Sequence, residues 1–242
     1  QFKLFSLLQK CCNACICNSQ FSKDEVQKII PNSKIHVIYN GLDPLVFKKN
    51  LLLRKLTRSS LDIQEDEIVL GIIANFRKQK NYPFLLKTFE KLSAKHGKLK
   101  LLCVGGGEHL EQSKLIVKRR NLNKKIIFTG YTELIVEYLN AIDILVLPSL
   151  WEGLPNALLQ AMSMEIPVVA SNVGGCLEII QHMNNGIIFH SNDVGEFTTH
   201  LENLINDKNL AYKLGYNARK TIEERFSLHR MIEEYSAFFK KL

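Results

Sequence analysis

Apolar runs of strand length alternate with helical stretches along most of the chain, and this alternation limits the folds open to it. The runs are continuous, because polar residues do not interrupt them at every second position. Strands have this pattern when helices cover both faces of their sheet. The sequence therefore predicts an α/β fold with a doubly wound, Rossmann-like parallel sheet. The expected strands are 35–39, 68–74, 99–104, 125–128, 144–147, 168–170 and 186–189, and the expected helices are 82–96, 109–120, 133–141, 155–164 and 193–206.

The two ends of the chain differ from this central body. Residues 1–40 hold too little for a domain of their own and predict a helix, a short strand near 14–17 and a second helix after Ser22. Asn40-Gly41 is a turn signal that closes this piece. The last 15 residues predict a helix with one apolar stripe, which packs either on this body or on another domain. The stripe consists of Leu228, Met231, Ile232, Tyr235, Phe238, Phe239 and Leu242.

The charge balance narrows the classes of partner. The chain has 242 residues and a formal charge of +8. That excess suits an anionic ligand, an anionic membrane surface or nucleic acid, or it is a solvated surface, since the cations are spread along the chain. No stretch is apolar and long enough to span a bilayer, and no signal peptide or Asn-x-Ser/Thr acceptor is present. We therefore expect a cytoplasmic protein, and the missing initiator Met suggests part of a longer one.

Cysteine and histidine spacing gives little support for a metal. Cys12 and Cys15 form a lone CxxC, and zinc or a redox pair would need further ligands or a thioredoxin-like context. The favoured interpretation is that these cysteines are reduced, partly buried thiols. The seven His residues show no metal-ligand spacing, and no Asp-x-Asp is present.

The segment 148–162 is the most informative one for chemistry. It follows an expected strand, and ligands of open parallel sheets bind beyond the carboxyl ends of the strands. Gly153 permits a close turn, and Pro155 suits the first position of a helix whose free amides would face an anion. Glu152 can accept hydrogen bonds from ligand hydroxyls or simply cap the helix. Asn156 and Gln160 are four residues apart and share a helix face.

A basic loop follows another expected strand. Residues 73–81 include Arg77, Lys78 and Lys80. Cations fixed at a strand end could neutralise a diphosphate and stabilise the charge that grows on a leaving phosphate. The alternative is a solvated basic loop. Two glycine-rich turns, at 104–107 and 173–175, also follow strands, but the first does not match GxGxxG because Leu110 stands where the third glycine should be.

Together and in this order, these segments resemble the carboxyl-terminal, donor-binding half of family 4 (group 1) GT-B glycosyltransferases over roughly the whole chain. The matching pieces are 37–43, the basic loop to Asn81, 104–107, 128–131, 143–162, 167–171 with Gly174-Gly175 and Glu178, and Asn185-Gly186. The resemblance implies an acceptor-side remnant and linker over 1–40, a nucleotide-sugar-binding domain over 41–226, and an amphipathic helix over 227–242 that crosses back to the first domain.

The resemblance also implies roles for particular residues. Glu152 begins the family's E-x7-E motif and would contact donor-sugar hydroxyls, while Arg77 and Lys80 would hold the diphosphate as catalytic cations. The second Glu of the motif is Gln160 here, at the ribose position, and Asn75 occupies the family's usual Arg position. The implied donor-binding residues are Asn75, Gly107, Tyr131, Gly153, Leu154, Pro155, Asn156 and Gln160.

The expected function is retaining transfer of a hexose from a UDP-, GDP- or ADP-sugar to a glycan or lipid-linked acceptor. Surface polysaccharide or lipopolysaccharide synthesis is the expected setting, without a metal cofactor or nucleic acid and with peripheral association to the inner face of the plasma membrane. One alternative is a truncated, non-catalytic nucleotide-sugar-binding fragment. The other is an NAD-binding module, against which the broken GxGxxG argues.

Overall fold

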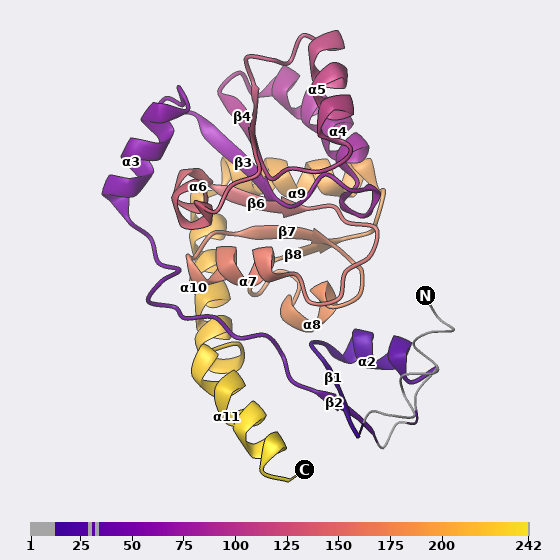
Figure 1. Cartoon of the computed structure of the whole chain (residues 1–242). Helices are drawn as coiled ribbons and strands as arrows, with labels where there is room; N and C mark the ends of the chain where they lie inside the picture. Colours follow the sequence, from indigo (N-terminus) through magenta and orange to yellow (C-terminus); the bar gives the residue numbers. More distant parts are fainter. Residues whose placement is uncertain (1–12, 29–30, 32–33, 242) are drawn as a thin grey trace.

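A six-stranded parallel sheet forms the centre of the protein (Figure 1). The computed structural model describes residues 13–28, 31 and 34–241. The strand order is β5-β4-β3-β6-β7-β8, and every neighbouring pair is parallel. The predicted doubly wound α/β sheet is therefore confirmed. The strands are β3 (Ile68–Ile73), β4 (Leu99–Val104), β5 (Ile126–Gly130), β6 (Ile144–Leu147), β7 (Val168–Ser171) and β8 (Ile187–Phe189).

The strand order reverses between β3 and β6, and this point determines where a ligand can lie. From β3 the chain builds outward through β4 and β5, then returns to place β6 on the other side of β3. The connections that follow β3 and β6 therefore diverge to opposite faces of the sheet and leave a crevice between them. Such a switch point is the usual ligand site of an open parallel sheet.

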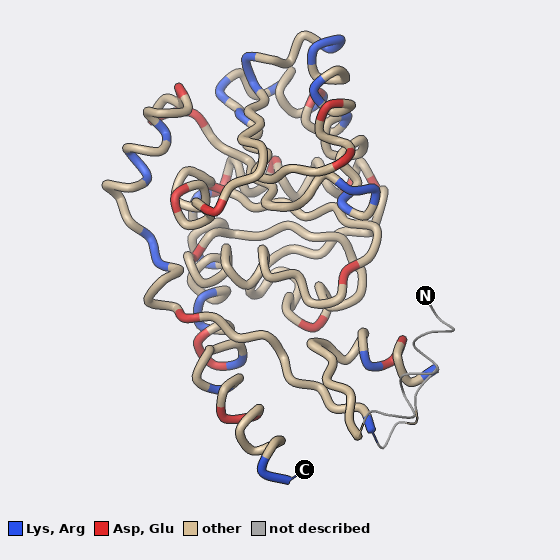
Figure 2. Tube along the Cα trace, in the orientation of Figure 1, with Lys and Arg blue, Asp and Glu red and all other residues tan. Residues whose placement is uncertain are grey.

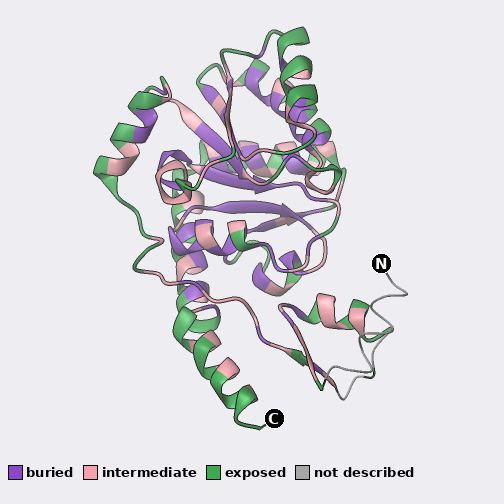
Figure 3. Ribbon diagram, viewed as in Figure 1, coloured by how far each residue is buried: buried purple, intermediate pink, exposed green. Residues whose placement is uncertain are grey.

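Helices cover both faces of the sheet, and each face has its own apolar cluster. Phe89 and Phe197 belong to the cluster under α4, α5 and α9, and Leu158 and Ile222 belong to the one under α7 and α10. Figure 3 shows the strands almost wholly buried between these layers. The helices around the sheet are α3 (Leu51–Ser60), α4 (Tyr82–Lys95), α5 (Leu110–Arg119), α6 (Ile135–Ala141), α7 (Asn156–Ser163), α8 (Cys176–Ile179), α9 (Val194–Asn206) and α10 (Lys208–Arg225).

Four elements differ from the sequence-based expectation, and one of them is the single-turn helix α8, which was not expected. The strand expected at 35–39 is the shorter β2 (Ile35–Val37), and it pairs with β1 (Cys15–Cys17) in a separate two-stranded sheet. Helices α3 and α10 were not expected at all. Both present few buried side chains, so their sequences lack the apolar periodicity that marks the other helices.

The described residues of 13–40 form a small unit beside the body, which we call the N-terminal unit. It consists of β1, α2 (Gln20–Val26) and β2, and its apolar cluster contains only two buried residues, Cys17 and Ile35. Ser19 caps α2 by accepting a hydrogen bond from the Ser22 amide. The first helix expected in 1–40 lies outside the described residues.

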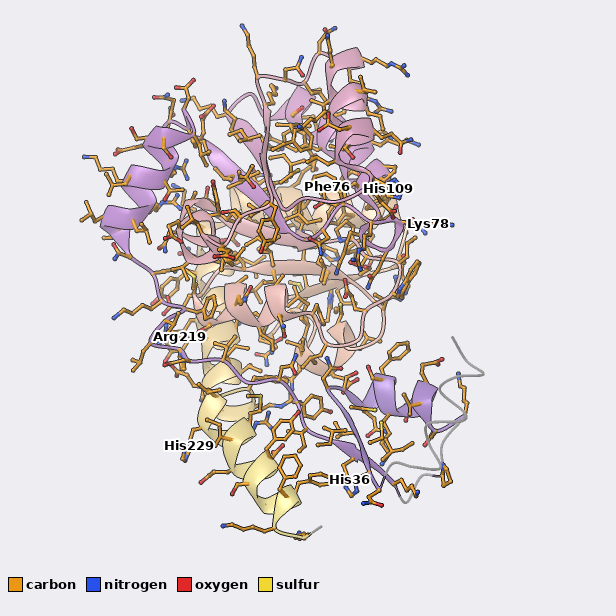
Figure 4. The ribbon with its side chains drawn as sticks, in the orientation of Figure 1. His36, Phe76, Lys78, His109, Arg219 and His229 are labelled. Atoms are coloured by element: carbon orange, nitrogen blue, oxygen red, sulfur yellow. The ribbon has the colours of Figure 1, made fainter. Side chains whose placement is uncertain are left out.

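The final helix, α11 (Leu228–Phe239), extends away from the sheet toward β2 (Figure 1). None of its residues is buried. The rings of Phe238 and His36 lie 4.8 Å apart, and the Gly41 amide lies 3.1 Å from the Met231 sulfur. Figure 4 places His36 beside the last turns of this helix. No described helix has both the length and the apolar character that crossing a membrane requires.

Candidate donor-binding site

The basic loop after β3 is held in place by an aromatic stack. Phe76 is fully buried, and its ring lies 3.8 Å from that of Tyr82 in a stacked arrangement. The loop then forms a short 3-10 turn, η2 (Lys78–Lys80), and Asn81 takes a left-handed conformation that lets α4 begin. Figure 4 shows Phe76 inside the molecule and Lys78 projecting outward at its edge. The loop is therefore a fixed support that presents some cations inward and others to solvent.

The loop after β6 carries Glu152 into a buried position at the other side of the crevice. Its side chain is only 5% exposed. The backbone of this loop is joined to the basic loop, since the Leu150 amide donates to the Gln79 carbonyl over 2.8 Å. Glu152 is followed at once by the start of α7, where Pro155 is the residue before the first helical position.

The carboxylate of Glu152 accepts three side-chain hydrogen bonds. Lys80 Nζ lies 2.5 Å from Oε1, and Ser149 Oγ lies 2.6 Å from the same oxygen. Gln79 Nε2 donates to Oε2 over 3.3 Å. Because a buried carboxylate is costly unless it is paired and hydrogen-bonded, these donors explain how a charge can be kept here. Two residues that the sequence assigned to one site, Lys80 and Glu152, are thus in direct contact.

Two glycines let the loop after β7 approach the backbone around Glu152. A Cβ atom on Gly174 would lie 1.9 Å from the Glu152 carbonyl oxygen, and one on Gly175 would lie 1.7 Å from the Gly153 carbonyl oxygen. Gly174 also has a φ of +44°. The turn at 173–175 is therefore explained by close packing against the Glu152 segment, and no ligand contact is needed to account for it.

A hollow of about 430 Å³ lies at the switch point between these loops. Its walls come from the ends of β3 and β4, from the residues after β5 and from the start of α7. Seven of the residues predicted from the sequence line it together: Asn75, Arg77, Lys80, Tyr131, Glu152, Pro155 and Asn156. Gly105, Thr132, Ile135, Ala157 and Gln79 complete much of the lining.

The other four predicted residues lie outside this hollow. Gly107 has a φ of +140°, and a Cβ there would lie 2.7 Å from the Phe76 amide nitrogen, so packing accounts for this glycine. Leu154 is buried in an apolar cluster, and Gly153 faces the N-terminal unit near Ser22. Gln160 lines a second hollow together with Asn40, Gly41, Asp43 and Met231, and Asn156 borders both hollows.

The charges around the hollow are unevenly paired. Lys80 is held by Glu152, whereas Arg77 is exposed and has no ion-pair partner among the described residues. Burial, followed by the nearby carboxylate of Glu152, raises the pKa of the Cys176 thiol well above its usual range. Cys176 is therefore a neutral, apolar neighbour of the site at physiological pH.

Sequence reasoning assigned no role to three side chains that shape this region, although Glu178 was among the positions that carry the family resemblance. Ser149 is fully buried beneath Glu152, and its carbonyl accepts a hydrogen bond from Ser171 Oγ over 2.5 Å. Gln79 bridges the two loops by also donating to the Trp151 carbonyl over 2.7 Å. Glu178 accepts hydrogen bonds from the backbone amides of Gln20 and Phe21. The first two were inside the highlighted segments, but only the fold brings them to Glu152.

The described part of the chain contains no cluster of side chains suited to bind a metal ion. There, no group of three or more His, Cys, Asp or Glu side chains is placed to hold an ion. Cys12 of the CxxC lies outside the described residues, while burial raises the pKa of the Cys17 thiol to about 11.

The sequence matches the family model "Glycosyl transferases group 1" over residues 54–221. The chain belongs to this family. It is 28% identical over 228 residues to an uncharacterized glycosyltransferase of Methanocaldococcus jannaschii, covering 92% of this chain and 58% of the relative. It is 27% identical over 194 residues to the capsular polysaccharide biosynthesis glycosyltransferase CapM of Staphylococcus aureus, covering 77% and 50%.

A third relative carries a more specific name. The chain is 28% identical over 231 residues to the UDP-Gal:alpha-D-GlcNAc-diphosphoundecaprenol alpha-1,3-galactosyltransferase of Escherichia coli, covering 93% of this chain and 59% of that enzyme. The chain thus spans between half and three fifths of the length of these curated relatives. Among them are enzymes of polysaccharide and capsule synthesis.

Solved structures agree with the fold. The structure of Anabaena HepE in complex with UDP and glucose superposes with a TM-score of 0.93 at 20% identity, over 100% of this chain and 67% of that one. The carboxyl-terminal domain of a group 1 glycosyl transferase from Francisella tularensis gives a TM-score of 0.70 at 25% identity, over 78% of this chain and 100% of that domain. The chain therefore has the fold of the carboxyl-terminal part of GT-B enzymes.

Proposed function

We propose that the hollow at the switch point binds a nucleoside-diphosphate sugar and that this chain is the donor side of a retaining hexosyltransferase. One observation carries the proposal: Arg77, Lys80 and Glu152 line one hollow beside the start of α7. Cations, free helix amides and a carboxylate are the groups that a diphosphate and sugar hydroxyls require. Family membership and the UDP complex of a protein with the same fold support this assignment.

Each residue then has a part in the chemistry. Arg77, which is exposed and pairs with no carboxylate of the described residues, serves as a fork for the diphosphate, and Lys80 acts as a point charge beside it. Both stabilise the negative charge that grows on the phosphate as the bond to the sugar breaks. Glu152 orients the sugar through its hydroxyls, and Asn156 and Tyr131 contact the donor from the opposite walls. Gln160 holds the ribose, in which case the second hollow extends the donor site past Asn156.

The acceptor class and the domain division are part of the same proposal. The named relatives act in capsule and lipid-linked glycan synthesis, which favours a glycan or lipid-linked acceptor in surface polysaccharide or lipopolysaccharide assembly. We assign residues 1–40 to the acceptor side and linker, residues 41–226 to donor binding, and residues 227–242 to a helix that crosses back. The contact between α11 and residue 36 favours that crossing.

Titration of UDP and GDP by calorimetry tests donor binding. Arg77→Ala and Lys80→Ala should each weaken binding by about 1.5–3 kcal/mol, the range for hydrogen bonds to charged groups. Lys78→Ala is the matched control, because Lys78 belongs to the same loop but points to solvent (Figure 4). Removing Lys80 also leaves Glu152 buried without its cation, so Lys80→Ala is repeated in a Glu152→Gln background. Equal affinity in Arg77→Ala, Lys78→Ala and the unmodified chain would remove the basic loop from the site.

A second candidate function is donor binding without transfer, and one observation favours it for the 242 residues taken alone. They cover only 58% and 50% of the lengths of two relatives they match. Orienting the acceptor against the donor contributes about 7–11 kcal/mol in well-placed systems, and an acceptor wall is needed for that. We expect UDP binding but no appreciable sugar transfer from this chain. Robust turnover with a defined acceptor would show that 242 residues suffice.

A further inference from the structure

Helix α3 lies on the body with its polar side inward and its leucines outward. Its only buried side chains are Thr57 and Arg58, whereas three leucines of the same helix face solvent. Amphipathic helices of globular proteins normally have the opposite orientation. Figure 3 shows the outward side of α3 as exposed surface. Two features of α3 are therefore unusual: its buried arginine and its exposed leucines.

The inward side is fixed by ion pairs. Arg54 Nη2 lies 2.6 Å from Asp143 Oδ1, and Arg58 Nη1 lies 3.2 Å from Asp143 Oδ2. Arg58 also donates to the carbonyls of Gln64 and Glu67, and Asp143 accepts from the Val69 amide. Arg58 is nearly fully buried in this network. Rotating the helix to bury its leucines would break these contacts, so the observed orientation is built into the fold.

The outward side carries an apolar stripe flanked by cations. Leu51, Leu52 and Leu56 are 82%, 68% and 58% exposed, and they lie on one face with Lys55. Lys48 precedes the helix, and neither it nor Lys55 has an ion-pair partner among the described residues. The sequence contains no acidic residue between Asp43 and Asp62. Figure 2 shows basic residues along α3. We call Leu51, Leu52, Leu56, Lys48 and Lys55 the α3 face.

An apolar hollow of about 430 Å³ opens next to the α3 face. It lies between α3 and the start of α10, at the amino ends of β3 and β6, far from the donor hollow at their carboxyl ends. Leu51 and the exposed ring of Tyr212 contribute to its lining, together with two cations, Lys49 and Lys208. Asp143 and Glu165 line it as well, and Glu165 pairs with Lys49, so this surface continues the apolar area beyond the helix and adds little net positive charge.

We infer that the α3 face docks on an anionic lipid bilayer. A helix that exposes leucines along one stripe, with lysines beside them and no carboxylates, is suited to the boundary between headgroups and acyl chains. The leucines would enter the acyl region, while Lys48 and Lys55 remain at the level of the anionic headgroups. The α3 face lies on the described body, and its docking on a bilayer does not depend on nucleotide binding in the hollow at the switch point.

Position and charge favour the bilayer over a protein partner. The N-terminal unit packs near α8 and α11, on the other side of the molecule from α3, so it does not cover the leucines (Figure 1). In a twofold pair of α3 faces, Lys48 and Lys55 of each copy would lie near those of the other, and residues 44–61 supply no carboxylate between them; Asp62 and Glu65 share a hollow with Lys55 only at the far end of the helix. An anionic bilayer neutralises the same lysines and accepts the leucines at once.

Vesicle co-sedimentation of the whole chain tests the inference. We expect binding to vesicles of phosphatidylcholine mixed with phosphatidylglycerol, and little binding to phosphatidylcholine alone. The triple variant Leu51→Ser, Leu52→Ser, Leu56→Ser should weaken partitioning at least about tenfold, since burial of three leucine side chains is lost. Lys48→Glu with Lys55→Glu should weaken it as well, and more so at low salt than at high salt.

Helix α5 supplies the matched controls. Leu115 is 56% exposed there and has Lys118 and Arg119 on the same helix. Leu115→Ser and the pair Lys118→Glu, Arg119→Glu make the same chemical changes elsewhere on a basic surface. These variants should retain binding if the α3 face is the docking surface. Equal losses in the α3 and α5 variants would mean only diffuse charge attraction and would overturn the inference.

Two further measurements test whether the variants stay folded and whether position 52 enters the bilayer. All α3-face variants should melt at the temperature of the unmodified chain, because the changed side chains are exposed. A tryptophan at position 52, introduced as Leu52→Trp with the single native tryptophan replaced as Trp151→Phe, should shift its emission to the blue when anionic vesicles are added. No shift would place position 52 outside the bilayer. Self-association of the unmodified chain without vesicles, abolished by the leucine variant, would show instead that the α3 face pairs two copies.

Discussion

The body of the protein and the N-terminal unit are held together by different forces. The body has two extensive apolar clusters, one on each face of its sheet. The N-terminal unit has a cluster with two buried residues, and it is tied to the body by polar contacts and by the packing of Tyr39 against Phe226. Glu178 accepts hydrogen bonds from the amides of Gln20 and Phe21 over 2.8 Å each and from the Tyr39 hydroxyl over 2.7 Å. Asn40 donates to Asn156 on α7.

Because the body has large apolar clusters and the N-terminal unit does not, similar substitutions should affect the stability of the two regions differently. Burial of apolar area is lost only when a core unfolds, so the body should behave as one cooperative unit. The few hydrogen bonds at the part-exposed seam contribute much less free energy than the apolar core of the body, so the N-terminal unit can separate from the body while the body stays folded. Because Gly153 faces Ser22 across this seam, such separation would alter one wall beside Glu152.

The largest expected effect comes from a core aromatic residue of the body. Phe197 is fully buried and packs against Phe189, with ring centroids 4.5 Å apart. Phe197→Ala should lower the free energy of unfolding by about 3–5 kcal/mol, because it removes buried surface and leaves a cavity. Phe21→Ala is the matched change in the N-terminal unit, where the ring is partly exposed, and should cost far less. Urea denaturation measures both, and similar losses would contradict the contrast between the regions.

A smaller effect is expected at the carboxylate that ties the seam. Glu178→Gln removes the charge and replaces one acceptor oxygen with an amide donor that faces a backbone N–H. Since hydrogen bonds to a charged group contribute about 1.5–3 kcal/mol, exchange of the Gln20 and Phe21 amides should accelerate by roughly 10- to 100-fold. Hydrogen exchange followed by NMR gives the rates. Glu224→Gln, an exposed change on α10, should leave them unaltered, and unchanged rates in Glu178→Gln would remove Glu178 from the seam.

Tyr39 should contribute less and in a pH-dependent manner. Burial, and then the hydrogen bond donated to Glu178, raise the pKa of Tyr39 to about 12. The folded pKa lies above the unfolded value of about 10, so this stabilisation is complete below about pH 10 and is lost as the pH rises through about 12. Tyr39→Phe should cost about 0.5–1.5 kcal/mol at neutral pH and abolish that part of the alkaline loss. An alkaline transition identical in both proteins would exclude Tyr39 as its source.

The smallest effect on stability is expected at Gln160, which lies on α7 facing the seam. Its side chain is part-exposed beside the second hollow, so Gln160→Glu should change stability by no more than about 0.5 kcal/mol. If Gln160 occupies the ribose position, the same change should tighten UDP binding through a charged acceptor. Thermal melting measures the change in stability, and calorimetry measures the change in UDP affinity. Unfolding of the domain by this change would show that Gln160 is a core residue instead.

The sequence predicted the elements whose apolar residues face the core. All six strands of the sheet and the helices from α4 to α7 and α9 match, because continuous or periodic apolar runs mark them. Helix α3 was missed because three of its leucines face outward and its arginines face inward, which is the reverse of the assumed pattern. Helix α10 was missed because charged and polar residues dominate it and few of its side chains are buried.

The site was predictable to the level of its segments and no further. Ligand position at the carboxyl ends of parallel strands follows from topology, and this rule brought Arg77, Lys80 and Glu152 together in advance. The sequence could not show that Lys80 pairs with Glu152, or that Ser149 lies beneath it, because those contacts depend on the strand order. It also could not distinguish Gly107 and Gly175 from residues that border the hollow. These two positions are glycine because a Cβ atom there would collide with neighbouring backbone.

The adjacency of β3 and β6 also has a consequence for folding kinetics. Lys80 and Glu152 meet although 72 residues separate them in the sequence, and the intervening chain contains β4 and β5 with their helices. Contacts of such long sequence separation form slowly, after local structure. A folding intermediate without β6 beside β3 lacks the donor hollow altogether. A nucleotide that binds the hollow would therefore stabilise only conformations in which β6 lies beside β3, and its rate of binding during refolding would report when that pairing forms.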